Sequence, residues 1–156
     1  MTELERLENI EMDAIPETGL AIIISPALEE SSLNKIIELL KCVIQIEKLD
    51  KTEDSKWEEN LPNWFVQKAK SVTKEELLKD DQLWDIGSWI DAIKQRGWKW
   101  CALKNQPGKT IIHLETFTYP YNIDSFFYIL YSIGIESERT EIFEIFPNSE
   151  NLKIIE

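Results

Sequence analysis

The sequence has few of the residues from which catalytic and metal-binding sites are usually built. It contains one histidine, two cysteines and five glycines in 156 residues. The glycine-rich phosphate-binding patterns G-x-x-x-x-G-K-[ST] and G-x-G-x-x-G do not occur in it. A zinc site needs about four ligands, and carboxylates would have to supply most of them in this chain. We therefore expect no catalytic residue, no metal site and no cofactor.

Cysteine motifs and long apolar runs are missing as well. Cys42 and Cys101 lie in apolar segments without C-x-x-C spacing, so we expect two reduced, buried thiols, with a disulfide only if the protein is exported. The most apolar early stretch, residues 20–24, is far too short to span a bilayer. The acidic N-terminal segment lacks the basic region of a signal peptide. These absences favour a cytoplasmic protein.

Positive charge is scarce: 17 basic residues stand against 29 acidic ones, and the net charge is −12. Nucleic-acid phosphates and anionic lipids bind clustered lysine and arginine, so the charge argues against both as partners. An acidic surface instead attracts a protein partner with a basic surface and speeds their encounter. The alternative is that the charge only keeps the protein in solution.

One segment departs from the acidic average. From Lys94 to Lys109 the chain carries five basic residues and no acid. With Trp98 and Trp100 among them, the segment has the composition of an aromatic and basic nucleic-acid platform. The surrounding negative charge opposes phosphate, so we interpret these lysines as protection for the edge of a strand.

Hydrophobic periodicity predicts an α+β fold. Residues 20–25 form a β-branched run that is typical of a buried strand. Residues 98–104 alternate with period two, which places Trp98, Trp100 and Ala102 on one face, and a turn at 105–108 leads to a second strand at 110–118. A strand at 141–146 follows, and residues 152–155 could pair with it. We predict a single domain over residues 1–156, in which several helices pack against a small antiparallel or mixed sheet.

Capping signals predict where the helices begin and end. Two of the signals are capping boxes, T-x-x-E, at Thr2 and Thr73. The predicted helix starts are Thr2, Ser31 or Ser32, Leu61 and Pro62, Thr73, Trp84 and Asn122, and the predicted stops include Gly97 and Gly134.

His113 and Glu115 are the residues with the clearest potential for chemistry. They lie two apart in a predicted strand, so their side chains share one face of the sheet. A general acid–base pair is one interpretation, and a Cys101–His113 dyad across the hairpin is another. No glycine turn that could form an oxyanion hole accompanies them. The favoured interpretation is a polar pair that stabilises a half-exposed face of the sheet.

Acidic residues beside tryptophan predict a protein-binding surface. Glu76 and Asp80, and likewise Asp81 and Asp85, are spaced i,i+4, where like charges repel if the segment is helical. Trp84 lies among these acids, and Trp57 directly precedes Glu58 and Glu59. Large aromatic side chains anchor protein interfaces, and charge steers the partners together. The predicted partner-binding residues are Trp57, Glu58, Glu59, Asp80, Asp81, Trp84 and Asp85.

The tryptophans must also fill the core. We expect Trp64, Trp89 and one of Trp98 or Trp100 to be buried. For Trp57 and Trp84, recognition and core packing stay open as alternatives, since tryptophan is often only partly buried.

The C-terminal half resembles small bacterial proteins, some of which are similar to immunity proteins of polymorphic and contact-dependent toxin systems. The resemblance rests on the stretch WDIGSWIDAIK from Trp84, on Trp98-Lys99-Trp100, and on Tyr119-Pro120-Tyr121 with the helix to Gly134. It carries over no functional residue. It implies a non-catalytic, acidic protein that binds and blocks a cognate toxin domain, often a basic one.

The sequence therefore predicts a cytoplasmic, non-catalytic protein-binding module, and more specifically an immunity protein that neutralises a toxin. Two alternatives stay open. One is a small enzyme or ligand-binding domain that uses His113 and Glu115, and the other is a self-associating structural subunit.

Overall fold

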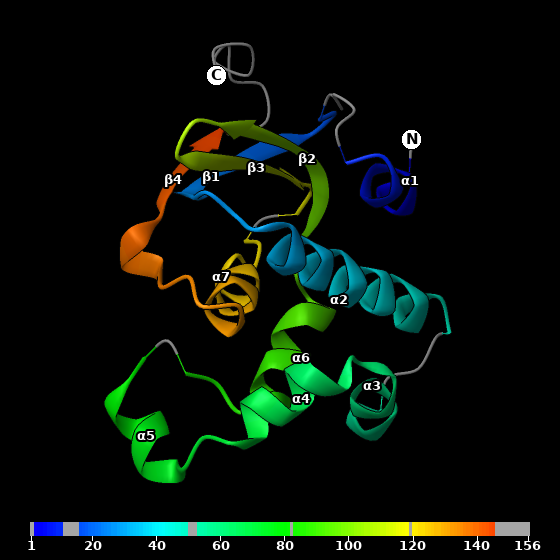
Figure 1. Cartoon of the computed structure of the whole chain (residues 1–156). Coiled ribbons are helices and arrows are strands. Elements are labelled where there is room, and N and C mark those ends of the chain that lie inside the picture. Colours follow the sequence, from blue (N-terminus) through cyan, green and yellow to red (C-terminus); the bar gives the residue numbers. More distant parts are fainter. Residues whose placement is uncertain (1, 11–15, 50–52, 82, 119, 146–156) are drawn as a thin grey trace. The chain divides into compact units, whose positions relative to one another are not determined.

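The computed structural model describes residues 2–10, 16–49, 53–81, 83–118 and 120–145. The chain forms two compact units. The sheet unit comprises Met1–Leu28, Gly97–Tyr121 and Glu138–Glu156, and the helical unit comprises Glu29–Arg96 and Asn122–Ser137. Helices and an antiparallel sheet are both present, which confirms the α+β class (Figure 1). The single domain expected from the chain length stays a prediction.

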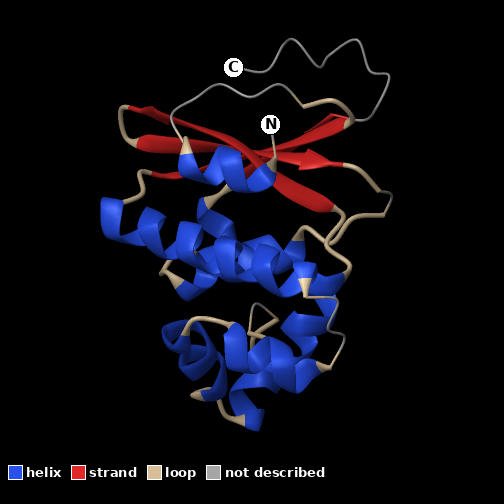
Figure 2. Ribbon diagram, turned by 90° about the vertical axis from the view of Figure 1, so that its right-hand side faces the viewer, coloured by secondary structure: helices blue, strands red, loops and turns tan. Residues whose placement is uncertain are grey.

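The sheet unit is built around a 4-stranded sheet in the order β2-β3-β1-β4. All three neighbouring pairs are antiparallel, and the strands form one twisted sheet (Figure 2). The predicted strand at 20–25 is the interior strand β1, and most of its side chains are buried. The predicted partner segment 152–155 lies outside the described residues. The strand bounds are β1 (Gly19–Pro26), β2 (Trp98–Gln106), β3 (Lys109–Thr116) and β4 (Glu141–Ile145).

The predicted hairpin is confirmed, but its turn and its register differ from the prediction. Only Pro107 and Gly108 separate β2 from β3, and Gly108 has the positive φ of 77° that the second central residue of a type II turn requires after proline. The register shifts between Trp100 and Ala102. A bulge there inserts one extra residue, so Ala102 lies on the opposite face from Trp100. The prediction that Trp98, Trp100 and Ala102 share a face is therefore wrong at Ala102.

A short helix, α1 (Glu3–Glu8), packs against β2 (Figures 1 and 2). The capping box predicted at Thr2 is present: the Thr2 hydroxyl accepts from the Glu5 amide, and the Glu5 carboxylate accepts from the Thr2 amide. Two buried contacts fix the helix on the strand. The Trp100 amide donates to the Glu3 carboxylate at 2.8 Å, and Arg6 donates to the Trp100 carbonyl at 3.5 Å.

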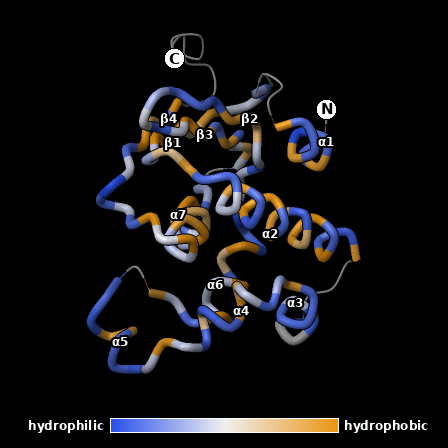
Figure 3. Tube along the Cα trace, viewed as in Figure 1, coloured by the Kyte–Doolittle hydropathy of each residue, from blue (hydrophilic) through white to orange (hydrophobic). Residues whose placement is uncertain are grey.

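The helical unit packs its helices around buried aromatic rings. Phe65 lies 4.5 Å from Trp89 and 5.7 Å from Tyr128 between ring centroids. The Trp89 indole also donates to the Ser125 carbonyl at 3.0 Å, which joins α6 to α7. Figure 3 shows α7 as mainly hydrophobic, in keeping with this central place. The helices are α2 (Glu30–Lys48), α3 (Asp54–Asn60), α4 (Asn63–Lys70), α5 (Lys74–Lys79), α6 (Ile86–Lys94) and α7 (Asp124–Ser132), and a 3-10 turn, η1 (Ser137–Arg139), follows.

Several predicted caps are wrong by one or two residues. Helix α2 begins before Ser31 and Ser32, with Glu29 in the cap position, because acids near a helix start are stabilised by the dipole without a side-chain cap. Helix α7 is preceded by Ile123 rather than by a capping Asn122. The capping box at Thr73 and the stop at Gly134, whose φ is 95°, agree with the prediction.

The predicted helix that contains Trp84 begins later than expected. Asp85 caps α6 by accepting from the Ser88 amide at 2.8 Å, so Trp84 lies in the segment that precedes the helix. The helix also ends at Lys94, before Gly97. Pro62, expected in the first helical turn, is the residue before α4.

The tryptophans divide differently from the expectation. Trp89, Trp98 and Trp100 are fully buried, so both hairpin tryptophans are in the core rather than one. Trp64 is half-buried, which corrects its predicted core position. Its indole donates to Glu38 at 2.8 Å, and the Lys35 ammonium lies 5.2 Å from its ring centroid. Polar partners therefore hold this ring near the surface of the helical unit.

Candidate functional site

Glu115 is held by structural contacts within the sheet unit. Its carboxylate lies 3.0 Å from the Arg6 guanidinium and accepts from the Glu17 amide at 2.6 Å and the Thr18 amide at 3.4 Å. Burial by itself would raise the pKa of Glu115, but these hydrogen bonds and the Arg6 charge together hold that pKa below its usual value. Glu115 therefore ties α1 and the chain before β1 to the sheet.

His113 lies two residues from Glu115 on the same face, and its own side chain is buried rather than half exposed, at 8% exposure. Cys101 is the extra residue of the bulge in β2, next to Ala102, which pairs with His113. Its side chain is 1% exposed. Burial raises the pKa of the Cys101 thiol to about 11, which leaves it almost entirely protonated at neutral pH. The described residues contain no group of three or more histidine, cysteine, aspartate or glutamate side chains that could hold a metal.

The first predicted anchor, Trp57, is a core residue. It is 2% exposed in α3 and offers no surface to a partner, so core packing is the alternative that applies to it. Its two acidic neighbours have partners on their own unit. Glu58 forms an ion pair with Lys70 at 2.6 Å, and Glu59 forms one with Lys56 at 3.6 Å.

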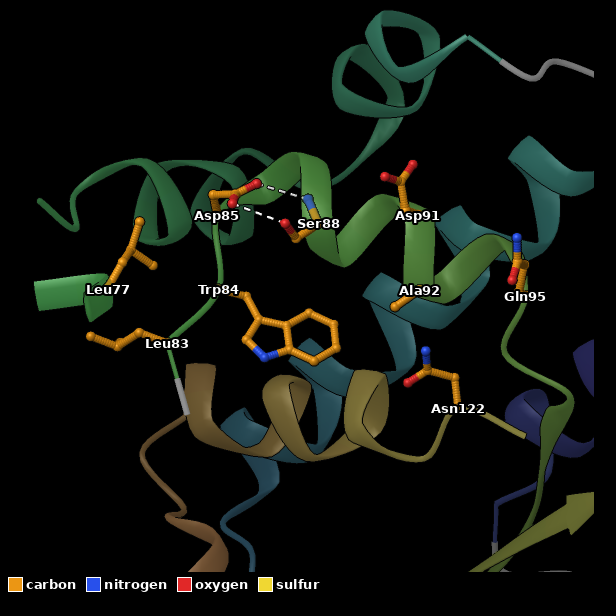
Figure 4. Close-up of a pocket in the computed structure, with 9 residues that line it drawn as sticks. All are labelled: Leu77, Leu83, Trp84, Asp85, Ser88, Asp91, Ala92, Gln95 and Asn122. Atoms are coloured by element: carbon orange, nitrogen blue, oxygen red, sulfur yellow. Dashed lines mark hydrogen bonds between the residues drawn. The ribbon is translucent and has the colours of Figure 1, made fainter. Parts of the chain in front are cut away.

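The second predicted anchor, Trp84, lines an open groove of about 660 Å³ in the helical unit. Figure 4 shows its indole between α6 and α7, and Asn122 near the end of the groove beside Ala92. We call this cavity the Trp84 groove. Its charged side chains are both acidic, Asp85 and Asp91. Leu77 and Leu83 complete its apolar part.

Trp84 also begins a stack of aromatic rings. Its ring lies nearly parallel to Tyr128 at 19°, with 6.1 Å between centroids. Tyr128 in turn lies nearly parallel to Tyr131 at 21° and 6.2 Å. We call these three residues the aromatic stack. They line a second cavity of about 360 Å³, the stack pocket, together with Asp81 and Asp124. Asp80 and Glu76 line a third cavity beside Tyr131, together with Lys68 and Lys79.

Nearby acids add to the effect of burial on the two tyrosines of the aromatic stack. Burial, the neighbouring Tyr131 and the charge of Asp85 raise the pKa of Tyr128 to about 12. The pKa of Tyr131 is also raised, by burial first and then by the charges of Asp80, Glu136 and Glu76. A phenolate is disfavoured where negative charge already surrounds it. The carboxylates that disfavour a phenolate here would favour a cation in the same place.

Two segments near the aromatic stack carry acids and no basic residue, whereas Lys68 and Lys79 line the third cavity. The stretch from Asp80 to Asp91 carries four aspartates and no lysine or arginine, and no lysine or arginine occurs between Lys109 and Arg139. Within the described part of the chain, Asp81, Asp91 and Asp124 form no ion pair. All three of these carboxyl groups belong to exposed residues.

The structure brings together four of the predicted partner-binding residues, namely Asp80, Asp81, Trp84 and Asp85, around the aromatic stack. The predicted helical repulsion between Asp81 and Asp85 does not occur, because Asp81 lies outside any helix and Asp85 is a cap. Trp57, Glu58 and Glu59 line none of these three cavities.

Sequence reasoning missed the contribution of α7. Asp124, Tyr128 and Tyr131 lie at i, i+4 and i+7, a spacing that places an acid and two aromatic rings on one side of a helix. The signal was present, but the prediction assigned α7 only to its apolar stripe. Asp91 was missed because it stands alone in the middle of α6.

No family model matches the chain, and no curated protein and no solved structure is significantly similar to it. None of the helices in the described ranges has both the length and the hydrophobicity needed to cross a membrane.

Proposed function

We propose that this chain is a cytoplasmic, non-catalytic protein that binds a partner with a basic surface through the acidic residues around Trp84. The observation that carries the proposal is the gathering of Asp81, Asp91 and Asp124, all without an ion pair within the described residues, around a half-buried Trp84. Following the resemblance of its C-terminal half, we further propose that it is an immunity protein and that the partner is a toxin domain.

The acidic side chains and the Trp84 ring should contribute to binding in different ways. Carboxylates at the rim of an interface raise the association rate of an oppositely charged partner, whereas a desolvated aromatic ring mainly slows dissociation. Trp84 lines two of the cavities, so its indole is accessible to a side chain that enters either of them. Blocking follows if the partner uses its basic surface to bind its own substrate.

The contacts of the sheet unit support binding rather than catalysis. Glu115, the acid of the alternative catalytic pair, already has an arginine and two backbone amides as partners. A general base must reach the proton that it removes, and a carboxylate engaged in this way is poorly placed to do so.

Capture and rescue test the proposal. The full chain is immobilised and exposed to a lysate of its own source cells, and the retained protein is identified and expressed alone in host cells. We expect this protein to have a basic surface and to arrest growth, and we expect co-expression of the chain to restore growth. A partner whose toxicity is unchanged by co-expression would exclude the immunity function.

A matched pair of triple variants tests whether the surface around Trp84 is used. D81N/D91N/D124N removes three charges beside Trp84 and the aromatic stack, and E8Q/E30Q/E141Q removes three charges from exposed residues that line none of the three cavities. Rescue should weaken with the first variant and persist with the second. Equal loss with both would show that only the net charge matters.

The self-associating subunit remains a second candidate because of β4. This strand lies at the end of the sheet order, and it exposes 52% of Phe143 and 38% of Ile142. An exposed apolar edge strand can pair with another copy. Light scattering of the pure protein at several concentrations decides between the two: a monomer at all of them excludes self-association as the function.

A further inference from the structure

We propose that the stack pocket receives the guanidinium group of an arginine side chain from the partner, an inference that rests on the proposed binding function. Trp84, Tyr128 and Tyr131 supply aromatic surface, and Asp81 and Asp124 supply carboxylates. The pocket lies entirely within the helical unit.

The charges that line the pocket favour a cation. Its charged lining residues are two aspartates, and neither forms an ion pair within the described residues. Asp81 and Asp124 are exposed, and Trp84 and Tyr131 are half-buried, so a cation can reach both the carboxylates and the two outer rings. A cation that enters such a site gains more from carboxylates and ring faces than it would on an open surface.

Trp64, in the same unit, combines an aromatic ring with a cation and a carboxylate. Trp64 has the Lys35 ammonium 5.2 Å from its ring centroid, and its indole donates to Glu38. A ring, a cation and a carboxylate from one chain are therefore already combined at Trp64. In the described part of the chain, no lysine or arginine takes the corresponding place over Trp84, Tyr128 or Tyr131. The stack pocket therefore contains aromatic rings and carboxylates, and we infer that a partner supplies the cation.

The geometry favours arginine over other cations. The three rings are nearly parallel, at 19° and 21°. A planar guanidinium stacks on parallel faces, carries five donors for the two carboxylates and is more weakly hydrated than an ammonium. A quaternary ammonium is bound best by a cage of rings that face it from several sides, and the aromatic stack does not form such a cage.

A titration of the full chain with blocked amino acids tests the pocket directly. The probe is N-acetyl-arginine N-methylamide, which imitates an arginine within a protein, and the readout is the indole N–H resonance of Trp84 in NMR spectra at constant ionic strength. The neutral isostere N-acetyl-citrulline N-methylamide is the matched control. We expect the arginine probe to shift the Trp84 resonance and the citrulline probe to bind at least about tenfold more weakly, because a cation–π contact is lost.

Variants connect the binding to the pocket. D81N/D124N should weaken the arginine probe by about tenfold, and Tyr131→Phe, which keeps the ring, should bind better than Tyr131→Ala. Trp64→Ala should leave the affinity unchanged, because Trp64 does not line the pocket. Equal binding of arginine and citrulline probes, or an affinity unaffected by D81N/D124N, would overturn the inference.

Two further comparisons distinguish a partner side chain from a small molecule, and the pocket inference from the proposed function. Free arginine that binds much more tightly than the blocked probe would indicate a small-molecule site and overturn the proposal of a partner side chain. If the arginine probe fails while the partner still binds in a manner that depends on Asp91 and salt, the pocket inference is wrong and the proposed function stands.

Discussion

The Arg6–Glu115 pair of the sheet unit and the acids around Trp84 in the helical unit differ in whether a basic side chain neutralises them. In the sheet unit, Glu115 and Arg6 neutralise one another in a buried pair, and backbone amides complete the contacts of the carboxylate. In the helical unit, Asp81, Asp91 and Asp124 have no such partner within the described residues and surround aromatic rings. His113 and Glu115 are the residues whose types are best suited to acid–base chemistry. In the fold, His113 is buried and Glu115 is paired, so the acids around Trp84 are the ones accessible to a partner.

The largest expected change in the free energy of unfolding comes from replacing Trp57, with Trp84 as the comparison. Trp57→Ala removes a ring that is 2% exposed and should lower the free energy of unfolding by about 3–5 kcal/mol. Trp84→Ala removes a half-buried ring and should cost markedly less. Urea unfolding followed by circular dichroism measures both. Equal losses would place Trp84 in the core and remove it as an anchor.

Breaking the buried ion pair of the sheet unit should have the next largest effect. Glu115→Gln leaves the Arg6 guanidinium without its carboxylate and should lower the free energy of unfolding by about 3 kcal/mol at pH 7. The pKa of Glu115 is lowered in the folded protein. Its stabilisation is therefore present above the unfolded pKa of about 4.3 and is lost as the pH falls through the folded value.

Unfolding curves at several pH values check this linkage. The stability difference between the native chain and Glu115→Gln should shrink as the pH falls below about 4. A difference that stayed constant down to the lowest pH would mean that the Arg6–Glu115 pair does not stabilise the fold.

Within the acids around Trp84, the two roles of aspartate should separate on a smaller scale. Asp85→Ala removes the cap of α6 and should cost about 1 kcal/mol, whereas Asp85→Asn keeps a capping side chain and should cost little. Asp91→Asn should change stability by less than about 0.5 kcal/mol. Thermal unfolding of the three variants provides the measurement, and a large loss for Asp91→Asn would assign it a structural role.

The smallest expected difference is in the alkylation rates of the two thiols. Cys42 in the helical unit is half-buried, and Cys101 in the sheet unit is 1% exposed with a pKa raised to about 11 by burial. An alkylating reagent at mildly alkaline pH should therefore modify Cys42 first in the native protein, and both thiols equally in urea. Mass spectrometry of timed samples follows each site. Faster labelling of Cys101 would contradict its burial.

Local sequence patterns predicted much of the fold. The hairpin, the strand β1 and both capping boxes follow from alternation and short-range hydrogen bonding, which the sequence contains directly. The bulge at Cys101 could not be predicted, because the apolar run around it is compatible with two registers. The start of α6 was missed because Asp85 can act either as a helical residue or as a cap.

The candidate site was predicted only in part, for a different physical reason. Asp80, Asp81, Trp84 and Asp85 are neighbours in sequence, and their composition indicated a surface. The contribution of Tyr128 and Tyr131 depends on how α7 packs beside Trp84, which is a tertiary contact. Burial of Trp57 likewise depends on tertiary packing and could not be separated from exposure by composition alone.

The most direct test of the proposed binding surface is the association rate of the captured partner at low and high salt. The native chain, D81N/D91N/D124N and E8Q/E30Q/E141Q are compared by stopped-flow fluorescence. At low salt, the first variant should associate at least about tenfold more slowly than the native chain, the second should differ by less than about threefold, and high salt should bring all three rates together. Association rates of the first variant that equal those of the native chain at low salt would contradict the account.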